Sequence, residues 1–221
     1  MLSRGVLAAL AILLAPAGAA AEEAAALAVR IGGDEIRMPV PAGYCEPTGR
    51  YANIAQLTDA MDRENITYLA LVDCAAVNAG RELSRYLFLR APKVFASERL
   101  TREQLFERMG PMPENAPNLL LDNPAMDQAK GAARRATGRN VELSGEMRPV
   151  AKDEAGYYMA GGLQQDDAGR SRRTSVGIGA TAVRGHVVTV NSYVRGSDLA
   201  AVREALKVAR ETTQGLVAAN P

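Results

Sequence analysis

The segment from 140 to 219 constrains the fold more than any other part of the chain. It contains four runs of strand-like composition, separated only by short turns such as "DDAGRS" (166–171) and "RG" (184–185): "NVELSGEMRPV", "GYYMAGGLQQ", "RTSVGIGATAVR" and "HVVTVNSYVR". Antiparallel strands are joined by tight turns, whereas parallel strands need a crossover of about a dozen or more residues. The four runs therefore predict an antiparallel β-meander.

A long amphipathic helix follows the fourth run. Ser197 is its predicted N-cap, and one face carries the apolar or small residues Leu199, Val202, Leu206, Ala209, Thr213 and Leu216. A helix with one apolar stripe must bury that stripe against another element of the fold. We expect it to pack on the meander.

The preceding part of the chain alternates shorter strand and helix signals. "ITYLALVDC" (66–74) reads as a buried strand, and Thr101 and Gln104 have the spacing of a capping box for a helix that ends near Gly110. The predicted fold class is α+β, with a mainly antiparallel sheet flanked by helices. Residues 22–221 are enough for one sizeable core, and we predict a single domain.

The first residues have the order of a secretory signal peptide. Arg4 gives a positive start, an uncharged apolar run covers 5–15, and small residues lead to Ala19, Ala21 and then Glu22. The run is shorter than the roughly 20 residues of a membrane-spanning helix. We predict a signal peptide over 1–21, cleaved between Ala21 and Glu22. The mature protein is then expected in the periplasm or outside the cell, without stable membrane insertion.

Export gives the two cysteines of the chain, Cys45 and Cys74, a physical role. In an oxidising compartment disulfides form and persist. The pair lacks the C-x-x-C spacing of a redox-active motif, and a zinc site needs more Cys or His than this chain has. We predict a structural disulfide, against the alternatives of two buried free thiols or a redox pair.

The charge balance excludes one large class of partner. The chain has 26 Lys plus Arg and 25 Asp plus Glu, and removal of 1–21 takes away only Arg4, which leaves 25 of each. A net charge of zero argues against nucleic acid or an anionic membrane surface as the main partner.

The motifs of the second half fit structural roles better than catalytic ones. "GIGATA" (177–182) precedes a strand-like run, whereas a dinucleotide fingerprint opens a helix, so we predict close packing under the C-terminal helix or a bulge. His186, the only histidine, follows a turn, and we expect a surface or hairpin residue. No catalytic residue, metal ligand or cofactor motif is assigned.

One basic cluster is a candidate for anion binding. "DDAGRSRR" (166–173) places Arg170, Arg172 and Arg173 beside two acids at a predicted hairpin tip. Adjacent carboxylates on a tip point into water rather than across a cleft, so they do not resemble the acid pair of a glycosidase. The arginines are candidates for an anion site.

Two features resemble known protein groups. The segment containing Pro41, Gly43, Tyr44 and Cys45 resembles the P-x-G-[FY]-C start of small exported bacterial proteins. The order of elements, with an early strand and a late meander followed by one helix, is similar to the PsbP-like α/β/α sandwich. That resemblance implies an accessory or binding role by analogy.

The sequence therefore favours a soluble exported protein that binds or assists an unknown envelope protein or small ligand without catalysis. An exported hydrolase with an unfamiliar site is one alternative, and its expected location is a cleft beside the proline-rich stretch 111–124. The other alternative is a small-ligand carrier with an enclosed apolar cavity.

Overall fold

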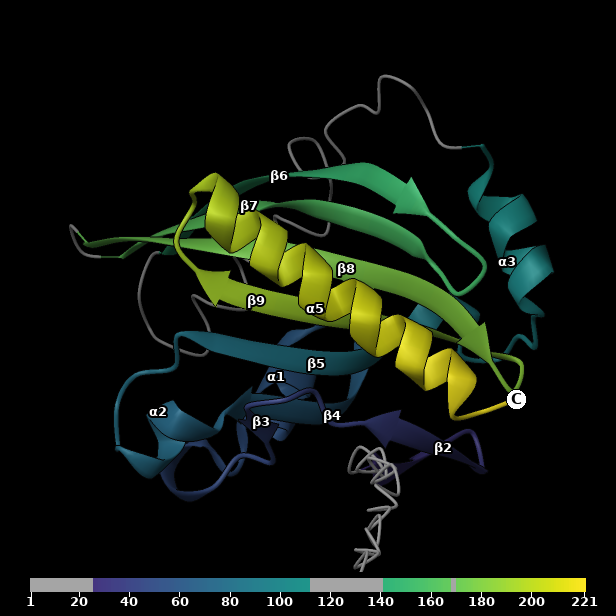
Figure 1. The fold of residues 1–221 in the computed structure, drawn as a ribbon, viewed down its shortest axis with the longest axis horizontal. Helices are drawn as coiled ribbons and strands as arrows, with labels where there is room; N and C mark the ends of the chain where they lie inside the picture. The colour runs from purple at the N-terminus through teal and green to yellow at the C-terminus, as the bar shows by residue number, and fades with distance from the viewer. Residues whose placement is uncertain (1–25, 112–140, 168–169) are drawn as a thin grey trace, which may run out of the picture.

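The computed structural model describes residues 26–111, 141–167 and 170–221, and its main feature is a seven-stranded antiparallel sheet (Figure 1). The strand order is β3-β4-β5-β9-β8-β7-β6. The strands are β3 (Tyr44–Cys45), β4 (Asn65–Asp73), β5 (Arg85–Pro92), β6 (Val141–Lys152), β7 (Tyr157–Asp167), β8 (Arg170–Val183) and β9 (His186–Arg195). The predicted meander is confirmed as β6 to β9. Pairing of β9 with β5 extends it into one sheet with the N-terminal half.

Helices and one hairpin complete the α+β fold that the sequence predicted. The remaining elements are β1 (Ala26–Ile31), β2 (Asp34–Pro39), η1 (Gly49–Tyr51), α1 (Ile54–Met61), α2 (Cys74–Asn78), η2 (Lys93–Phe95), α3 (Arg102–Met109) and α5 (Leu199–Ala218). The capping box of Thr101 and Gln104 is present, and Gly110 ends α3. Within the described ranges, no helix is long and apolar enough to cross a membrane. The predicted signal peptide and its cleavage residues lie outside these ranges.

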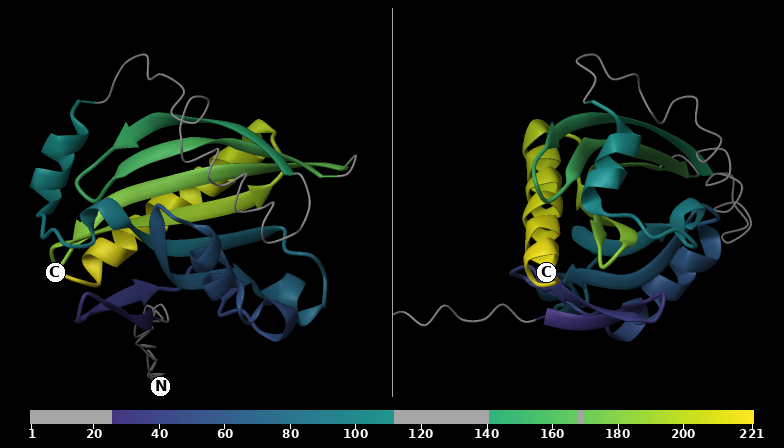
Figure 2. Two further views of the ribbon diagram at one scale, coloured as in Figure 1. Left: turned by 180° about the vertical axis from the view of Figure 1, so that it is seen from behind. Right: turned by 90° about the vertical axis from the view of Figure 1, so that its right-hand side faces the viewer.

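The two faces of the sheet carry different layers (Figure 2). We call the side on which α5 lies the helix face, and the other side the far face. On the helix face, α5 and the β1–β2 hairpin cover a continuous apolar core that includes Ile36, Leu71, Leu89, Val190 and Leu216. On the far face, Leu100 and the α3 residue Leu105 pack against Ala182 and Val187.

The C-terminal helix packs on the sheet as predicted, but its start and its stripe differ from the prediction. Asp198, not Ser197, is the N-cap, and its carboxylate accepts a hydrogen bond from the Ala201 amide at 2.7 Å. Leu199 is 62% exposed. Two adjacent residues with good capping side chains make the boundary ambiguous by one position. The buried face is set separately by close packing on β8, where Gly177 lies against Ala205 and Gly179 against Thr213. The buried positions are Ala205, Val208, Ala209, Thr212, Thr213 and Leu216.

Glycines on β8 let α5 approach the sheet closely. A Cβ atom added at Gly177 would overlap the backbone of Ala205 and Leu206 in α5, and one at Gly179 would overlap the hydroxyl of Thr213. The close packing predicted for "GIGATA" is therefore confirmed. Glycine is needed here for the space that it leaves to a neighbouring backbone.

A polar cluster around Asp153 ties α5 to the turn between β6 and β7. Its carboxylate accepts hydrogen bonds from the Tyr158 hydroxyl at 2.9 Å, from Gln214 at 2.9 Å and from Arg210 at 3.0 Å. Burial alone would raise the pKa of Asp153, but the hydrogen bonds from Tyr158, Gln214 and two backbone amides outweigh burial and lower the pKa. The ionised carboxylate is therefore the form that the fold stabilises.

Asp153→Asn is expected to lower the free energy of unfolding by about 2 kcal/mol at pH 7, because hydrogen bonds to a charged group contribute about 1.5–3 kcal/mol each. A carboxyl whose pKa is lowered in the folded state stabilises the fold above its unfolded pKa of about 3.9 and loses that effect as the pH falls through the folded pKa. Urea denaturation of both proteins at pH 7 and pH 3 measures the difference. It should shrink at pH 3; an equal difference at both values contradicts the role of the charge.

Candidate functional site

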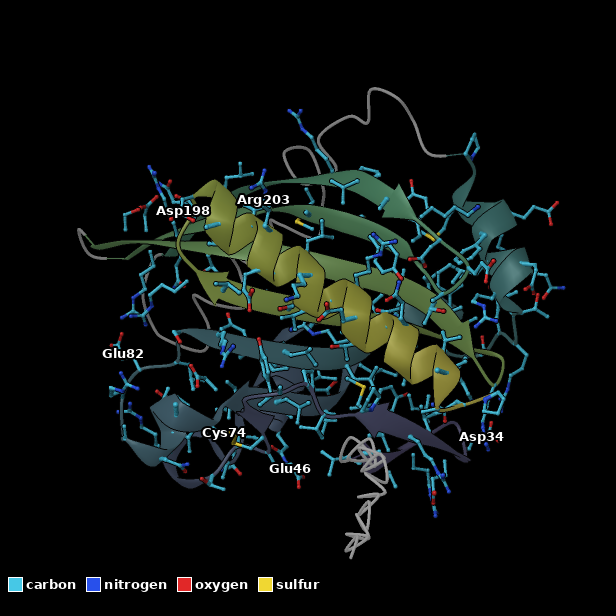
Figure 3. All side chains as sticks on the ribbon, in the orientation of Figure 1. Asp34, Glu46, Cys74, Glu82, Asp198 and Arg203 are labelled. Carbon is cyan, nitrogen blue, oxygen red and sulfur yellow. A yellow bond between two sulfur atoms is a disulfide. The ribbon has the colours of Figure 1, made fainter. Side chains whose placement is uncertain are left out.

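A groove of about 1000 Å³ opens at the end of the sheet where β7 and β9 end and β5 and β8 begin. Glu82, on the loop before β5, marks this end of the molecule in Figure 3, where Asp198 is also labelled. The groove is lined by Arg50, Tyr51, Glu82, Leu83, Ser84, Tyr86, Gln165, Ser171, Arg172, Arg173, Thr174, Arg195, Gly196 and Ser197. We call it the arginine groove.

The arginines predicted as anion-site candidates differ in their positions on β8. Arg172 pairs with Gln165 and lies on the far face, because side chains alternate along a strand. Arg173 lies on the helix face, where its Nε donates to the Gln164 side-chain oxygen at 3.3 Å. The side chain of Arg170 lies outside the described part. Arg172 and Arg173 both line the groove. Only Arg172 lies on the far face, which it shares with the groove residues Tyr86 and Arg195.

Two further arginines reach the groove from other elements. Arg195, at the end of β9, donates from Nη2 to the Glu82 carboxylate at 2.7 Å and to the Leu83 carbonyl at 3.3 Å. Arg50, in η1, donates from Nη2 to the carbonyls of Gly80 at 3.1 Å and Arg81 at 2.7 Å. Its guanidinium also stacks 4.8 Å from the centre of the Tyr51 ring. Both are held in place before any ligand arrives.

Glu82 is the negative group among these arginines. The hydrogen bond from Arg195 and the positive charges of Arg195, Arg172 and Arg50 lower the pKa of Glu82. Three guanidinium groups thus act on one carboxylate. Exposed ion pairs of this kind add little to stability, since the Arg195 and Glu82 side chains are 54% and 62% exposed. The cluster therefore has little value as a structural brace.

An aromatic layer supports the inner end of the groove. Tyr86 stacks on Tyr193 with ring centres 4.7 Å apart, and Phe88 meets both rings edge-on. Arg90 lies over the Phe88 ring at 4.7 Å and pairs with Asp62 at 3.4 Å. Burial raises the pKa of Tyr86, so its hydroxyl remains neutral at physiological pH. Tyr86 therefore gives the groove an aromatic side, which Phe88 and Tyr193 support from behind.

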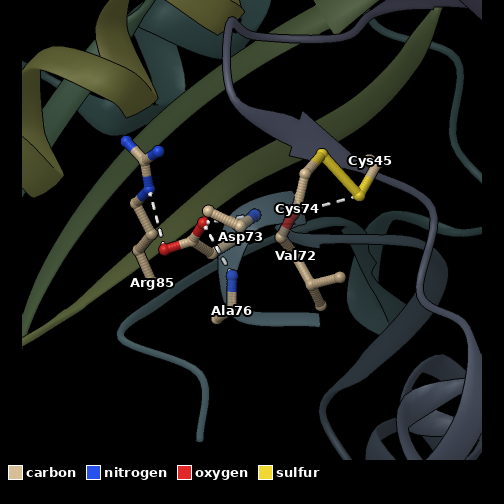
Figure 4. Close-up of a disulfide and its surroundings, with 7 residues drawn as sticks. Cys45, Val72, Asp73, Cys74, Ala76 and Arg85 are labelled. Atoms are coloured by element: carbon tan, nitrogen blue, oxygen red, sulfur yellow. Dashed lines mark hydrogen bonds and ion pairs between the residues drawn. A yellow bond between two sulfur atoms is a disulfide. The ribbon is translucent and has the colours of Figure 1, made fainter. Parts of the chain in front are cut away.

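The predicted disulfide joins Cys45 and Cys74, whose Cα atoms are 5.4 Å apart. It links β3 to the start of α2 (Figure 4). Asp73, beside Cys74, caps α2 through the amides of Ala75 and Ala76 and accepts a hydrogen bond from Ser84 at 2.8 Å. Ser84 lines the arginine groove, so the disulfide and the groove share a structural support.

His186 follows the turn at 184–185 as predicted, but the expectation of a surface residue is wrong, because its side chain is 7% exposed. The turn of the β1–β2 hairpin covers it, with Gly32 against the imidazole ring. Its Nε2 lies 2.8 Å from the Asp34 carboxylate, which also pairs with Arg99 at 2.7 Å. His186 therefore fixes the hairpin to the sheet.

Local sequence patterns predicted only part of this site. The "DDAGRSRR" run identified Arg172, but Arg50, Glu82 and Arg195 are separated along the chain and meet only because β5 pairs with β9 and β9 with β8. In the described ranges, no group of three or more His, Cys, Asp or Glu side chains is arranged to hold a metal ion. The hydrolase cleft expected beside 111–124 lies, except for Pro111, outside the described residues.

No known protein family, curated protein or solved structure matches this chain.

Proposed function

We propose that this chain is an exported accessory or binding protein of the bacterial envelope, which holds a partner or small ligand at the arginine groove without catalysing a reaction. The observation that carries the proposal is the convergence of Arg50, Arg172 and Arg195 around one carboxylate in an open groove. Arginine is suited to recognition because its planar guanidinium binds oxyanions through paired hydrogen bonds and remains charged at physiological pH.

The chemistry of the groove favours binding over proton transfer. A general base works best when its pKa is near the operating pH. The neighbouring arginines lower the pKa of Glu82 instead, which makes this carboxylate a weaker base. Tyr86 has a raised pKa and stays protonated. The polar groups therefore supply fixed charge and hydrogen-bond donors.

The Cys45–Cys74 disulfide supports the location part of the proposal, since disulfides persist mainly in oxidising compartments. With the signal peptide proposed over 1–21, the working form begins at Glu22 in the periplasm, and release outside the cell is compatible with the same signal. The P-x-G-[FY]-C and PsbP-like resemblances remain analogies that agree with an accessory role.

Capture experiments test the proposal with the full chain expressed in a bacterial host. The protein is expected in the periplasmic fraction with Glu22 as its first residue, as read by N-terminal sequencing. Immobilised on resin, it is expected to retain one or two envelope proteins in repeated trials, which a second, unrelated exported bait does not retain. Protein that keeps residues 1–21 and stays in the membrane fraction contradicts the proposal of a cleaved signal peptide and a periplasmic mature form. Turnover of a substrate in a broad hydrolase screen contradicts the non-catalytic role.

A further inference from the structure

The arginine groove carries more positive charge than its own acid can balance. Four arginines, Arg50, Arg172, Arg173 and Arg195, line the groove with Glu82 as the one acid among the described residues of its lining, so three positive charges remain. The mature chain as a whole is neutral, with 25 basic and 25 acidic residues after removal of Arg4. The surplus is therefore a local feature of this groove.

The hydrogen bonds of the arginines show which donors remain for a ligand. Arg50 and Arg195 each use Nη2 on protein oxygens, which fixes the orientation of their guanidinium planes. Arg172 forms no side-chain hydrogen bond within the part of the chain that the structure describes. Its planar fork of N–H donors matches the two oxygens of a carboxylate.

The carboxylate of Glu82 shows where in the groove a negatively charged group lies among the arginines. Glu82 reaches the arginines from an exposed loop, and its side chain is 62% exposed. Among the described residues, its one ion pair is with Arg195. A carboxylate held so loosely between cations occupies the position that an incoming carboxylate would take. Leaving that position costs little, because exposed ion pairs are weak.

We infer that the arginine groove binds a carboxylate-bearing ligand, and that Glu82 is a built-in competitor for the same arginines. This inference rests on the proposed function and specifies the chemistry of its partner. The ligand places one carboxylate on Arg172 and another against Arg195, and its apolar part lies along Tyr86 and Tyr51. An acidic segment of a partner protein and a small polycarboxylate share this chemistry.

Calorimetric titration of the periplasm-purified protein separates the two sources. The probes are a blocked peptide of six glutamates, citrate and inorganic phosphate, each at constant ionic strength. We expect the peptide to bind more tightly than citrate if the ligand is an acidic segment, and the reverse for a small polycarboxylate. Absence of heat with both carboxylate probes, or tighter binding of phosphate than of either, overturns the inference.

Substitutions inside and outside the groove locate the binding. Arg172→Gln is expected to weaken carboxylate binding about tenfold, which corresponds to the loss of one charge-assisted contact. Arg30→Gln is the matched control: it removes the same charge from an exposed position on β1 that does not line the groove, and should change affinity less than about twofold. Glu82→Gln is expected to strengthen binding about threefold or more. Equal weakening by both arginine variants, or weaker binding by Glu82→Gln, overturns the inference.

The capture experiment distinguishes the two proposals from each other. If wild type and Arg172→Gln retain the same envelope protein equally well, the accessory role stands and the carboxylate site is wrong. If no envelope protein is retained but the carboxylate probes bind in an Arg172-dependent manner, the site stands and the accessory role is wrong.

Discussion

Gly177→Ala is expected to lower the free energy of unfolding by about 3 kcal/mol, the upper end of the range for overpacking. The added Cβ would overlap the carbonyl of Ala205 and the amide of Leu206, which belong to the backbone of α5. A side chain can rotate away from such a contact, but a helix backbone must lift as a unit. Lifting α5 would loosen the core around Val208 and Leu216. Denaturant unfolding followed by circular dichroism measures the change.

Gly162→Ala is the matched control for this prediction. Gly162 lies on the neighbouring strand β7, and a Cβ added there would be 3.8 Å from the Thr174 carbonyl, an ordinary contact. Its effect should be within about 0.5 kcal/mol, the usual size for a substitution without a specific mechanism. Gly179→Ala should lie between the two, because the Thr213 side chain, rather than backbone, stands in the way. Equal stabilities for Gly177→Ala and Gly162→Ala would show that α5 is not so closely packed.

The parts of the fold that follow from neighbouring residues were predictable. Short turns could only produce antiparallel pairing of β6 to β9, and the Thr101–Gln104 spacing located α3 to the residue. The disulfide was predictable because two cysteines allow only one bridge. The start of α5 was missed by one residue, since Ser197 and Asp198 both suit an N-cap and only the folded chain selects between them.

Features that depend on long-range pairing were not predictable in the same way. The burial of His186 requires the β1–β2 turn, more than 150 residues earlier in the chain, to lie over it: the Asp34 contact has a sequence separation of 152. The arginine groove likewise requires β9 to lie between β5 and β8. The basic run gave Arg172 and Arg173 equal weight, and only their pairing with β7 places them on opposite faces.

Removal of the Cys45–Cys74 bridge is expected to lower the free energy of unfolding by about 3–4 kcal/mol, the chain-entropy value for a bridge that spans 29 residues. The double variant with both cysteines changed to serine and the wild type reduced with dithiothreitol should unfold at the same urea concentration. The oxidised wild type should unfold at a clearly higher one. Coincident transitions for oxidised and reduced protein would show that the bridge does not constrain the unfolded chain.

The same bridge is expected to affect the groove for a different reason. Arg50 and Tyr51 lie inside the loop that the disulfide closes, and Arg50 is held by carbonyls of Gly80 and Arg81 just beyond it. If the bridge acts only by lowering the entropy of the unfolded chain, its removal changes stability alone. If the bridge also holds η1 in place, its removal changes the shape of the folded groove. Titration of the glutamate peptide into the double serine variant, under conditions where it is fully folded, separates these effects. If the double serine variant loses as much affinity as Arg50→Gln does, the bridge positions η1 at the side of the groove. If the affinity of the double serine variant is unchanged, the bridge acts on stability only. The contacts of Arg50 with the α2–β5 loop are then sufficient to hold η1 in place.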